Sequence, residues 1–182
     1  MLDIGSGGYS TDKRYTSVDL ETECDIQATM WDIPLPDNCV NQIYSSNALE
    51  HVGKNDVVPT LREWYRILEP DGTIQLFVPD FEWAVTFWLD HKDDTTWPLD
   101  IIFGNQNHDG EYHRTGFTLN TLIDYFRQSV EDNQAKWYIK SATYMPGENL
   151  TGNPDRVTEI EPGRYENIIN QQLIVIEAQK ML

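Results

Sequence analysis

A glycine-rich turn close to the N-terminus and an acid shortly after it are the residues best suited to ligand binding. The apolar run Leu2-Asp3-Ile4 leads directly into Gly5-Ser6-Gly7-Gly8, and a second short run, 15–18, ends on Asp19. Glycine tolerates positive φ angles and lets the backbone approach a ligand closely. A carboxylate at the end of a neighbouring parallel strand can accept hydrogen bonds from two hydroxyl groups, as a ribose requires. A single turn of this kind is common, so its meaning depends on the rest of the chain.

Histidines and acids further along the chain are candidates for acid–base chemistry. His51 follows a predicted strand, where ligands of open α/β sheets bind, so it either contacts a substrate or hydrogen-bonds a helix start. Asp80 follows the next strand, as a site residue or as a helix N-cap. A histidine with an ordinary pKa of about 6.5 can remove a proton from a hydroxyl or amine, and His113 is therefore a further candidate.

A polar stretch around His113 also contains residue types that bind metal ions. Hard and borderline ligands of this kind suit a divalent ion. Acid-rich loops produce such groups by chance, and from the sequence we expect no metal. The residues of the group are His108, Asp109, Glu111 and His113.

Helix and strand patterns alternate along the chain, as in a βαβ protein. Leu61, Trp64, Tyr65 and Leu68 recur at helical spacing and place one apolar face against a sheet. This helix is expected to start near residues 55–56 and to stop at 70–72, and further helices are predicted over 81–89 and from Thr118 onwards. The predicted strands cover residues 2–4, 15–18, 41–45, 73–78, 137–144 and 172–178.

Two features depart from a regular βαβ pattern. Only the ten residues 5–14 separate the first two predicted strands, whereas a parallel crossover needs roughly 10–12 residues or more. The first helix must therefore be absent or reduced to a turn. Residues 91–117 are predicted to be an inserted, loop-like region on the substrate side, and 145–165 an irregular connection. We expect one domain over residues 1–182.

Four motifs occur in order along the first 88 residues. They are Leu2-Asp3-Ile4-Gly5-Ser6-Gly7, then Val18-Asp19-Leu20, then Pro34-Leu35-Pro36-Asp37-Asn38 leading to Leu49-Glu50-His51-Val52, and finally Arg66-Ile67-Leu68-Glu69-Pro70-Asp71-Gly72. Together they resemble class I S-adenosylmethionine-dependent methyltransferases, particularly the small type 11 branch. The resemblance is fainter around 112–118 and negligible between 130 and 165. It implies a Rossmann-like α/β fold with about seven mostly parallel strands and an antiparallel C-terminal edge.

The resemblance implies S-adenosylmethionine as the cofactor and assigns residues to it. Gly5, Ser6 and Gly7 border the methionine end of the cofactor, and Asp19 holds the ribose hydroxyls. Asp3, Leu20 and Ser46 complete this set. His113 ranks first among the candidate catalytic residues because it lies in the segment that the branch resembles, ahead of His51 and Asp80.

The adenine-facing position departs from the family pattern. The position usually held by an aspartate is Thr29, followed by Met30. The Thr29 hydroxyl can hydrogen-bond the exocyclic amine, and Met30 can offer its backbone amide and an apolar face. Alternatively, Asp32 supplies the carboxylate. The reaction that the resemblance implies is a direct displacement, in which proximity and orientation can lower the barrier by about 7–11 kcal/mol.

Composition limits the classes of partner. The formal net charge of −17 disfavours nucleic acid, whose binding depends on Lys and Arg neutralising phosphates. No apolar run reaches 18 residues, so we expect no membrane span, and no leader segment is evident. Cys24 and Cys39 lack zinc-type or CxxC spacing, which indicates free thiols in a reducing compartment and hence a cytoplasmic protein.

We therefore expect an enzyme that transfers a methyl group to an O or N nucleophile of a small-molecule or glycan-like acceptor. The alternative is a binding module that keeps this fold without transfer activity, for which the short first crossover and Thr29 argue. A dinucleotide-dependent enzyme is a third hypothesis, which the Leu-Pro and Leu-Glu-His segments disfavour. The oligomeric state is not indicated.

Overall fold

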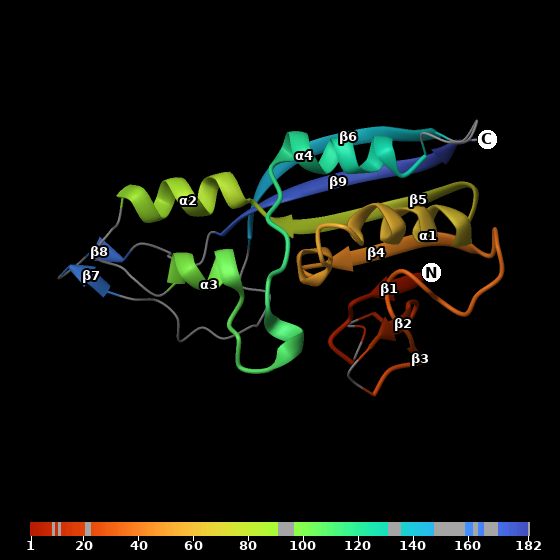
Figure 1. Cartoon of the computed structure of the whole chain (residues 1–182), viewed down its shortest axis with the longest axis horizontal. Helices are drawn as coiled ribbons and strands as arrows, with labels where there is room; N and C mark the ends of the chain where they lie inside the picture. Colours follow the sequence, from red (N-terminus) through yellow and green to blue (C-terminus); the bar gives the residue numbers. More distant parts are fainter. Residues whose placement is uncertain are drawn as a thin grey trace.

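A single large sheet organises the computed structural model, which describes residues 1–8, 10, 12–20, 23–90, 97–130, 136–147, 159–161, 164–165 and 171–181. The strands of this sheet are β1 (Leu2–Ile4), β2 (Thr16–Asp19), β3 (Ile26–Gln27), β4 (Val40–Ser46), β5 (Leu68–Pro79), β6 (Lys136–Gly147) and β9 (Gln171–Met181). Their order is β3-β2-β1-β4-β5-β9-β6 (Figure 1). The first five are parallel, and β9 runs antiparallel to both β5 and β6. The predicted Rossmann-like fold with an antiparallel C-terminal edge is confirmed.

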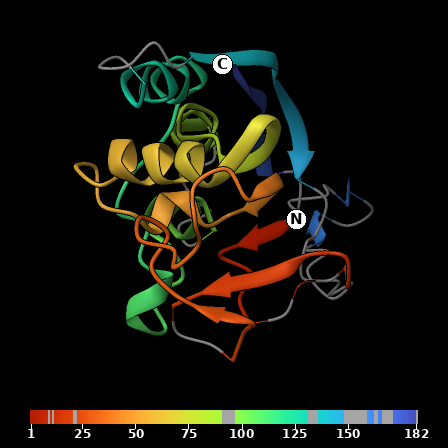
Figure 2. The ribbon, with the colours of Figure 1, turned by 90° about the vertical axis from the view of Figure 1, so that its right-hand side faces the viewer.

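The helices lie mainly on one face of this sheet. They are the single turn η1 (Leu49–His51), α1 (Val57–Ile67), α2 (Phe81–Asp90), α3 (Trp97–Phe103), the turn η2 (Asp109–Glu111) and α4 (Leu119–Gln128). Figure 2 shows α1 and α4 on the same side of the strands. Trp64 of α1 and Phe126 of α4 are fully buried against strand residues such as Ile74 and Ile176. A small antiparallel pair, β7 (Glu159–Glu161) with β8 (Arg164–Tyr165), lies outside the main sheet.

The ends of α1 and α4 follow from local chemistry. Thr118 begins α4 with a capping box, in which its Oγ1 accepts a hydrogen bond from the Thr121 N–H and its own N–H donates to Thr121 Oγ1. The predicted start of this helix is therefore confirmed. Helix α1 ends at Ile67, before the predicted stop at 70–72, and Asp71 takes a left-handed φ of 66° within strand β5, which begins at Leu68.

The connection between β1 and β2 contains no helix in its described residues, as its length predicts. The chain turns back directly, and the Gly5 N–H donates to the Val18 carbonyl at 2.8 Å. The end of β1 and the end of β2 therefore lie side by side, which places the glycine turn next to Asp19.

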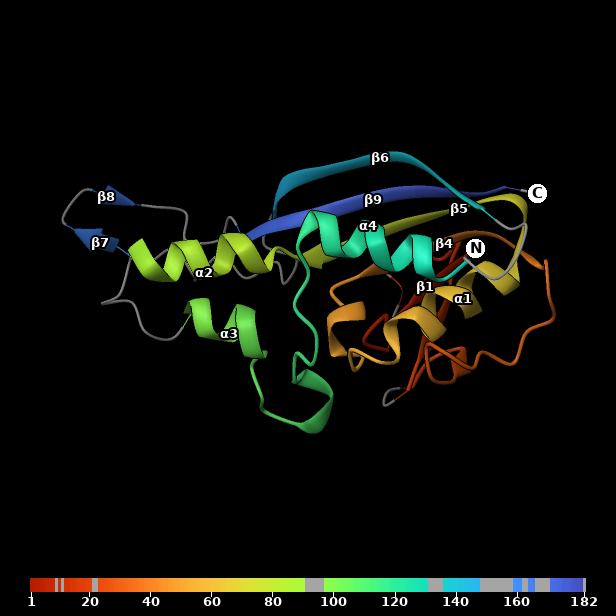
Figure 3. The ribbon, with the colours of Figure 1, turned by 45° about the horizontal axis from the view of Figure 1, so that its top comes forward.

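The prediction of a loop-like region over 91–117 is corrected by helix α3 and the turn η2 in its described part. Figures 1 and 3 show α3 beside α2, beyond the end of the sheet. This packing buries Ile101 to 8% exposure, a tertiary contact that the local sequence pattern does not reveal. Most of 145–165 lies outside the described residues. No helix in the described part of the chain is long and apolar enough to cross a membrane.

Candidate active site

The glycine turn after β1 adopts a conformation that requires glycine. Gly5 and Gly7 have φ angles of 74° and 64°, a region that other residues enter only with strain. A Cβ atom on Gly5 would lie 2.2 Å from the Cβ of Ala48, whereas one on Gly7 would meet nothing within 4 Å. Gly5 therefore packs closely against Ala48, which follows β4. The space around the position of a Gly7 Cβ is open.

Asp19 lies directly beside this turn. Its Oδ2 accepts a hydrogen bond from the Gly7 N–H at 2.9 Å. Ser6, within the turn, has a buried Oγ that lacks a hydrogen-bond partner. Asp3 is 8% exposed at the end of β1, and burial raises its pKa against the opposing effect of a hydrogen bond from Ser10. The structure therefore brings Asp3, the glycine turn and Asp19 to one place.

The segment after β3 contains the residues expected to face the adenine. Thr29 and Asp32 pair as an isolated antiparallel bridge, in which the Asp32 N–H donates to the Thr29 carbonyl at 3.4 Å. The Met30 carbonyl accepts from Trp64 Nε1 at 3.0 Å, and the Met30 methyl lies 3.9 Å from the position of a Gly5 Cβ. Met30 is thus close to the glycine turn, while Leu20 is 52% exposed.

The end of β4 lies on the other side of β1 from β2. Ser46 is half-buried and is followed by Asn47, which has a left-handed φ of 49°. The buried Oδ1 of Asn47 has no hydrogen-bond partner. Asn47 was not predicted from the sequence as a site residue, although an asparagine at the end of a parallel strand is a signal that could have identified it.

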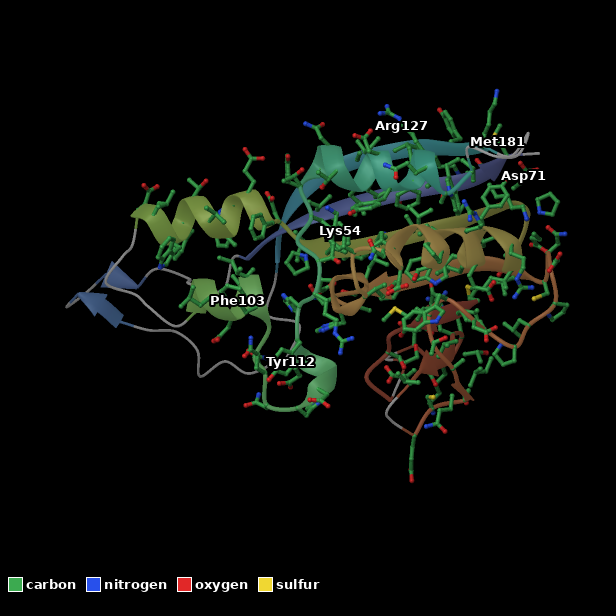
Figure 4. The ribbon with its side chains drawn as sticks, in the orientation of Figure 1. Lys54, Asp71, Phe103, Tyr112, Arg127 and Met181 are labelled. Carbon is green, nitrogen blue, oxygen red and sulfur yellow. The ribbon has the colours of Figure 1, made fainter. Side chains whose placement is uncertain are left out.

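A second group of polar side chains, Glu50, His51 and His113, follows Asn47. The backbone carbonyl of Glu50 accepts from the N–H groups of Arg114 and Thr115 at 2.8 and 3.1 Å. This brings His113 to η1, with its Nε2 4.0 Å from Glu50 Oε1 and its ring centroid 4.9 Å from that of His51. Figure 4 shows the labelled Phe103 and Tyr112 on the two segments that flank this region.

Burial dominates the electrostatics of this group. Glu50 is 2% exposed, and desolvation raises the pKa of its carboxyl to about 8. Desolvation also lowers the pKa of His113 to about 4, despite the Ile101 carbonyl that accepts from its Nδ1. The pKa of His51 is lowered by the same cause, opposed by the carbonyls of Tyr112 and Asn47. Both imidazoles are therefore neutral at pH 7.

The remaining candidates, Asp80 and His108, have other hydrogen-bond or ion-pair partners. Asp80 is buried and its Oδ1 accepts from the Glu82 N–H at 3.0 Å, which is the geometry of a helix N-cap. His108 lies 3.5 Å from Glu111 in an exposed turn. Within the described residues, the metal-type group that the chain assembles is Glu50, His51 and His113, and not the set around His108. Glu50 was not selected from the sequence, although it stands in the Leu49-Glu50-His51 motif.

Comparison with known proteins agrees with this arrangement. The family model Methyltransf_11, described as a methyltransferase domain, matches residues 2–76, which carry β1 to β4 and most of β5. These matched residues are fewer than half of the chain, and over them the sequence is similar to the type 11 branch of the methyltransferases. The match supports S-adenosylmethionine as the methyl donor. No curated protein matches the sequence at a significant level.

Solved structures of low sequence identity share the fold of this chain. A Methanosarcina mazei S-adenosylmethionine-dependent methyltransferase has a TM-score of 0.62 at 16% identity, covering 100% of this chain and 92% of the other. A methyltransferase in a complex with the Haloferax volcanii Trm112 activator has a TM-score of 0.61 at 16% identity, with coverages of 100% and 82%. The 1,6-didemethyltoxoflavin-N1-methyltransferase of Burkholderia thailandensis, with its substrate and S-adenosylhomocysteine bound, has a TM-score of 0.60 at 13% identity, with coverages of 100% and 70%.

The residues around the glycine turn fit S-adenosylmethionine. The open space at Gly7 lets the backbone approach a ligand, and the unpartnered Ser6 Oγ and Asn47 Oδ1 are buried polar atoms that a bound ligand can satisfy. The cofactor supplies a methyl group on a sulfonium centre. The chain offers a carboxylate, glycine backbone amides and buried polar atoms that would hold and orient such a ligand at the carboxyl ends of β1, β2 and β4.

Proposed function

We propose that this protein is an S-adenosylmethionine-dependent methyltransferase, which transfers the methyl group to an O or N nucleophile of a small-molecule or glycan-like acceptor. The observation that supports it is the group formed by buried Glu50 and the part-buried His51 and His113, which follows the Ala48 that packs against the glycine turn. The structural neighbour from Burkholderia thailandensis is an N1-methyltransferase of a small molecule. The net charge of −17 argues against nucleic acid as acceptor, and free Cys24 and Cys39 suit the cytoplasm.

We assign cofactor binding to one set of residues around the ends of the parallel strands. Asp19 is proposed to hold the ribose hydroxyls, with its carboxylate fixed by the Gly7 N–H. Thr29 and Met30 are proposed to meet the adenine, because α1 fixes this segment through Trp64. The other members are Asp3, Gly5, Ser6, Gly7, Leu20 and Ser46.

We assign the acceptor side to His113 and His51. The Nδ1 of His113 lies 2.7 Å from the Ile101 carbonyl, which can only accept, so Nδ1 carries the hydrogen and Nε2 carries a lone pair. A lone pair at this position can hold the hydroxyl or amine of an acceptor, which aligns it for displacement. Asp80 stays a predicted site residue, although its carboxylate is engaged at the start of α2.

The experiment is a methyl-transfer assay with a panel of alcohols, phenols, amines and sugars. Wild type is expected to methylate a subset of these acceptors, and Asp19→Ala to lose transfer through weaker cofactor binding. His113→Ala is expected to reduce turnover at least tenfold while cofactor affinity changes little. Cofactor binding without transfer to any acceptor would instead favour a non-catalytic module.

A further inference from the structure

Glu50 is a buried carboxyl group whose partner is missing. It is 2% exposed, and neither carboxylate oxygen has a hydrogen-bond partner. The nearest titratable atom is His113 Nε2 at 4.0 Å, beyond hydrogen-bond distance. Native proteins rarely leave a buried carboxylate unpaired, because desolvating its charge costs several kcal/mol. We therefore expect either a proton on the Glu50 carboxyl group or a cation beside it.

The two histidines are oriented as metal ligands commonly are. Nδ1 of His113 donates to the Ile101 carbonyl at 2.7 Å, and Nδ1 of His51 donates to the Tyr112 carbonyl at 3.2 Å. The Ile101 carbonyl fixes the His113 ring and leaves its Nε2 with the lone pair, while the His51 ring faces a second carbonyl, that of Asn47, besides Tyr112. In metal sites, a ligating histidine almost always donates its other N–H in this way, to a carbonyl or a carboxylate.

Backbone hydrogen bonds bring these side chains together, although His113 is far from Glu50 and His51 in the sequence. The Glu50 carbonyl accepts from the N–H groups of Arg114 and Thr115, and Thr115 Oγ1 donates to the Val52 carbonyl at 2.7 Å. Gly104 permits the approach of the same segment, since a Cβ there would lie 1.7 Å from the Glu111 carbonyl oxygen. One ligand atom from each of Glu50, His51 and His113 consequently lies within 4.8 Å of the others.

The donor set selects the kind of ion. Two imidazoles and one carboxylate suit borderline transition metals, whereas Mg²⁺ and Ca²⁺ prefer oxygen ligands throughout. Zinc bonds of about 2.0–2.2 Å require ligand atoms closer together than those seen here, so binding of the ion would draw the three side chains together. Three protein ligands leave a fourth position open, as in catalytic zinc sites.

We propose that Glu50, His51 and His113 bind a divalent transition metal ion, Zn²⁺ by donor type, whose open position receives the nucleophilic oxygen or nitrogen of the acceptor. The role of the ion in catalysis rests on the proposed function, whereas the binding of the ion does not. In the presence of the ion, the Nε2 lone pair of His113 binds the metal, and the metal binds the acceptor in its place. A metal-bound hydroxyl would lose its proton more easily to water, and the oxyanion that forms is a better nucleophile at neutral pH. Its oxygen would bond to the methyl carbon as the bond from that carbon to the sulfonium sulfur breaks, which leaves S-adenosylhomocysteine.

The test uses the full chain, freed of metal with a chelator and then titrated with Zn²⁺ by calorimetry and with Co²⁺ by visible absorption. Wild type is expected to bind one ion and to show the intense bands of four-coordinate Co²⁺. Glu50→Gln and His113→Ala are expected to weaken binding at least tenfold. His108→Ala, which removes a histidine of the same segment outside the group, is the matched control and should bind as wild type does.

Three outcomes would overturn the proposal: no saturable binding by folded wild type, unchanged binding in Glu50→Gln and His113→Ala, or an equal loss in His108→Ala. Circular dichroism of each variant establishes that it is folded, and Glu50→Gln conserves the volume of the side chain. Metal binding without any methyl transfer would contradict only the proposed function. Undiminished transfer in the presence of chelator would contradict only the metal.

Discussion

Gly5 and Gly7 share a left-handed backbone conformation but meet different surroundings, and this difference is testable. Gly5→Ala adds strain and a clash with Ala48, since the new Cβ would lie 2.2 Å from that side chain. We expect it to lower the free energy of unfolding by about 2–5 kcal/mol. Gly7→Ala adds only the strain, about 1–2 kcal/mol, but places a methyl group where the cofactor approaches.

Urea denaturation and calorimetry with S-adenosylhomocysteine separate these two effects. Gly7→Ala should bind the cofactor product at least tenfold more weakly while staying folded, whereas Gly5→Ala should mainly lose stability. Equal destabilisation of both variants, with unchanged affinity in Gly7→Ala, would contradict the geometry of the turn.

Glu50 makes the stability of the metal-free protein depend on pH. Its pKa is raised to about 8 from 4.5, so the folded chain holds a proton that the unfolded chain has lost between these values. Stability therefore falls as pH rises through this window. His113, with its pKa lowered to about 4 from 6.5, acts in the opposite sense below pH 6.5. The other charged groups that influence this cluster are Glu111 and Arg114, through His51.

Above pH 6.5, the effect of Glu50 on stability is no longer opposed by that of His113. In chelator-treated protein we expect the free energy of unfolding to fall between pH 6.5 and 8, as measured by urea denaturation. Glu50→Gln should be nearly flat over the same range. A wild-type curve that is flat or rises would show that Glu50 is not desolvated in the folded state.

At the scale of elements, helix α1 holds the segment proposed to meet the adenine. Besides the Trp64 bond to Met30, the Glu63 carboxylate accepts from the Ile33 N–H at 2.9 Å, and Arg66 donates to the Leu35 carbonyl at 2.8 Å. Three residues within about one turn of this helix thereby fix the chain between β3 and β4. The cofactor pocket therefore depends on a helix that contributes no side chain to the proposed cofactor set.

Trp64→Phe removes one of these bonds and leaves the Met30 carbonyl without its donor. We expect a loss of about 1–3 kcal/mol in stability, together with weaker S-adenosylhomocysteine binding measured by calorimetry. Tyr65→Phe is the control, because it removes a bond from the same helix to the Met181 carbonyl, away from this segment. If both variants bound equally well, α1 would have no part in shaping the pocket.

Elements with strong periodicity were predictable from the sequence, whereas short ones were not. Leu61 and Trp64 mark the buried face of α1, and the apolar runs identify β1, β4, β5 and β9. Strand β3 has only two residues, Ile26 and Gln27, which is too short for a pattern. Helix α3 depends on packing against α2 rather than on its own sequence. The order of the motifs nevertheless placed Gly7 and Asp19 in the right relation, because parallel strands end at the same edge.

The contact between Glu50 and His113 belongs to the scale of the whole molecule. It joins residues 63 positions apart through a segment that crosses from α3 back to η1. Local patterns do not encode such a contact, so the sequence grouped His113 with its neighbours in the chain instead. The acidity of the chain is a second property at this scale.

Thirty acidic residues face thirteen basic ones, so the folded chain carries strong self-repulsion. Salt shortens the Debye length from about 30 Å at 0.01 M to about 3 Å at 1 M. We therefore expect the melting temperature to rise as NaCl is increased over this range. KCl should act in the same way, and sucrose serves as an uncharged control. A melting temperature that is insensitive to both salts would show that repulsion does not limit stability.

The central claim is that Asp19 and the glycine turn bind S-adenosylmethionine, and calorimetric titration tests it most directly. Purified wild type should bind S-adenosylmethionine and S-adenosylhomocysteine saturably with one site each, and should not bind NAD. Asp19→Ala should bind both ligands at least tenfold more weakly. Glu69→Ala, an exposed acid at the opposite end of β5, should bind as wild type does. Absence of binding to folded wild type, or full affinity in Asp19→Ala, would contradict the account.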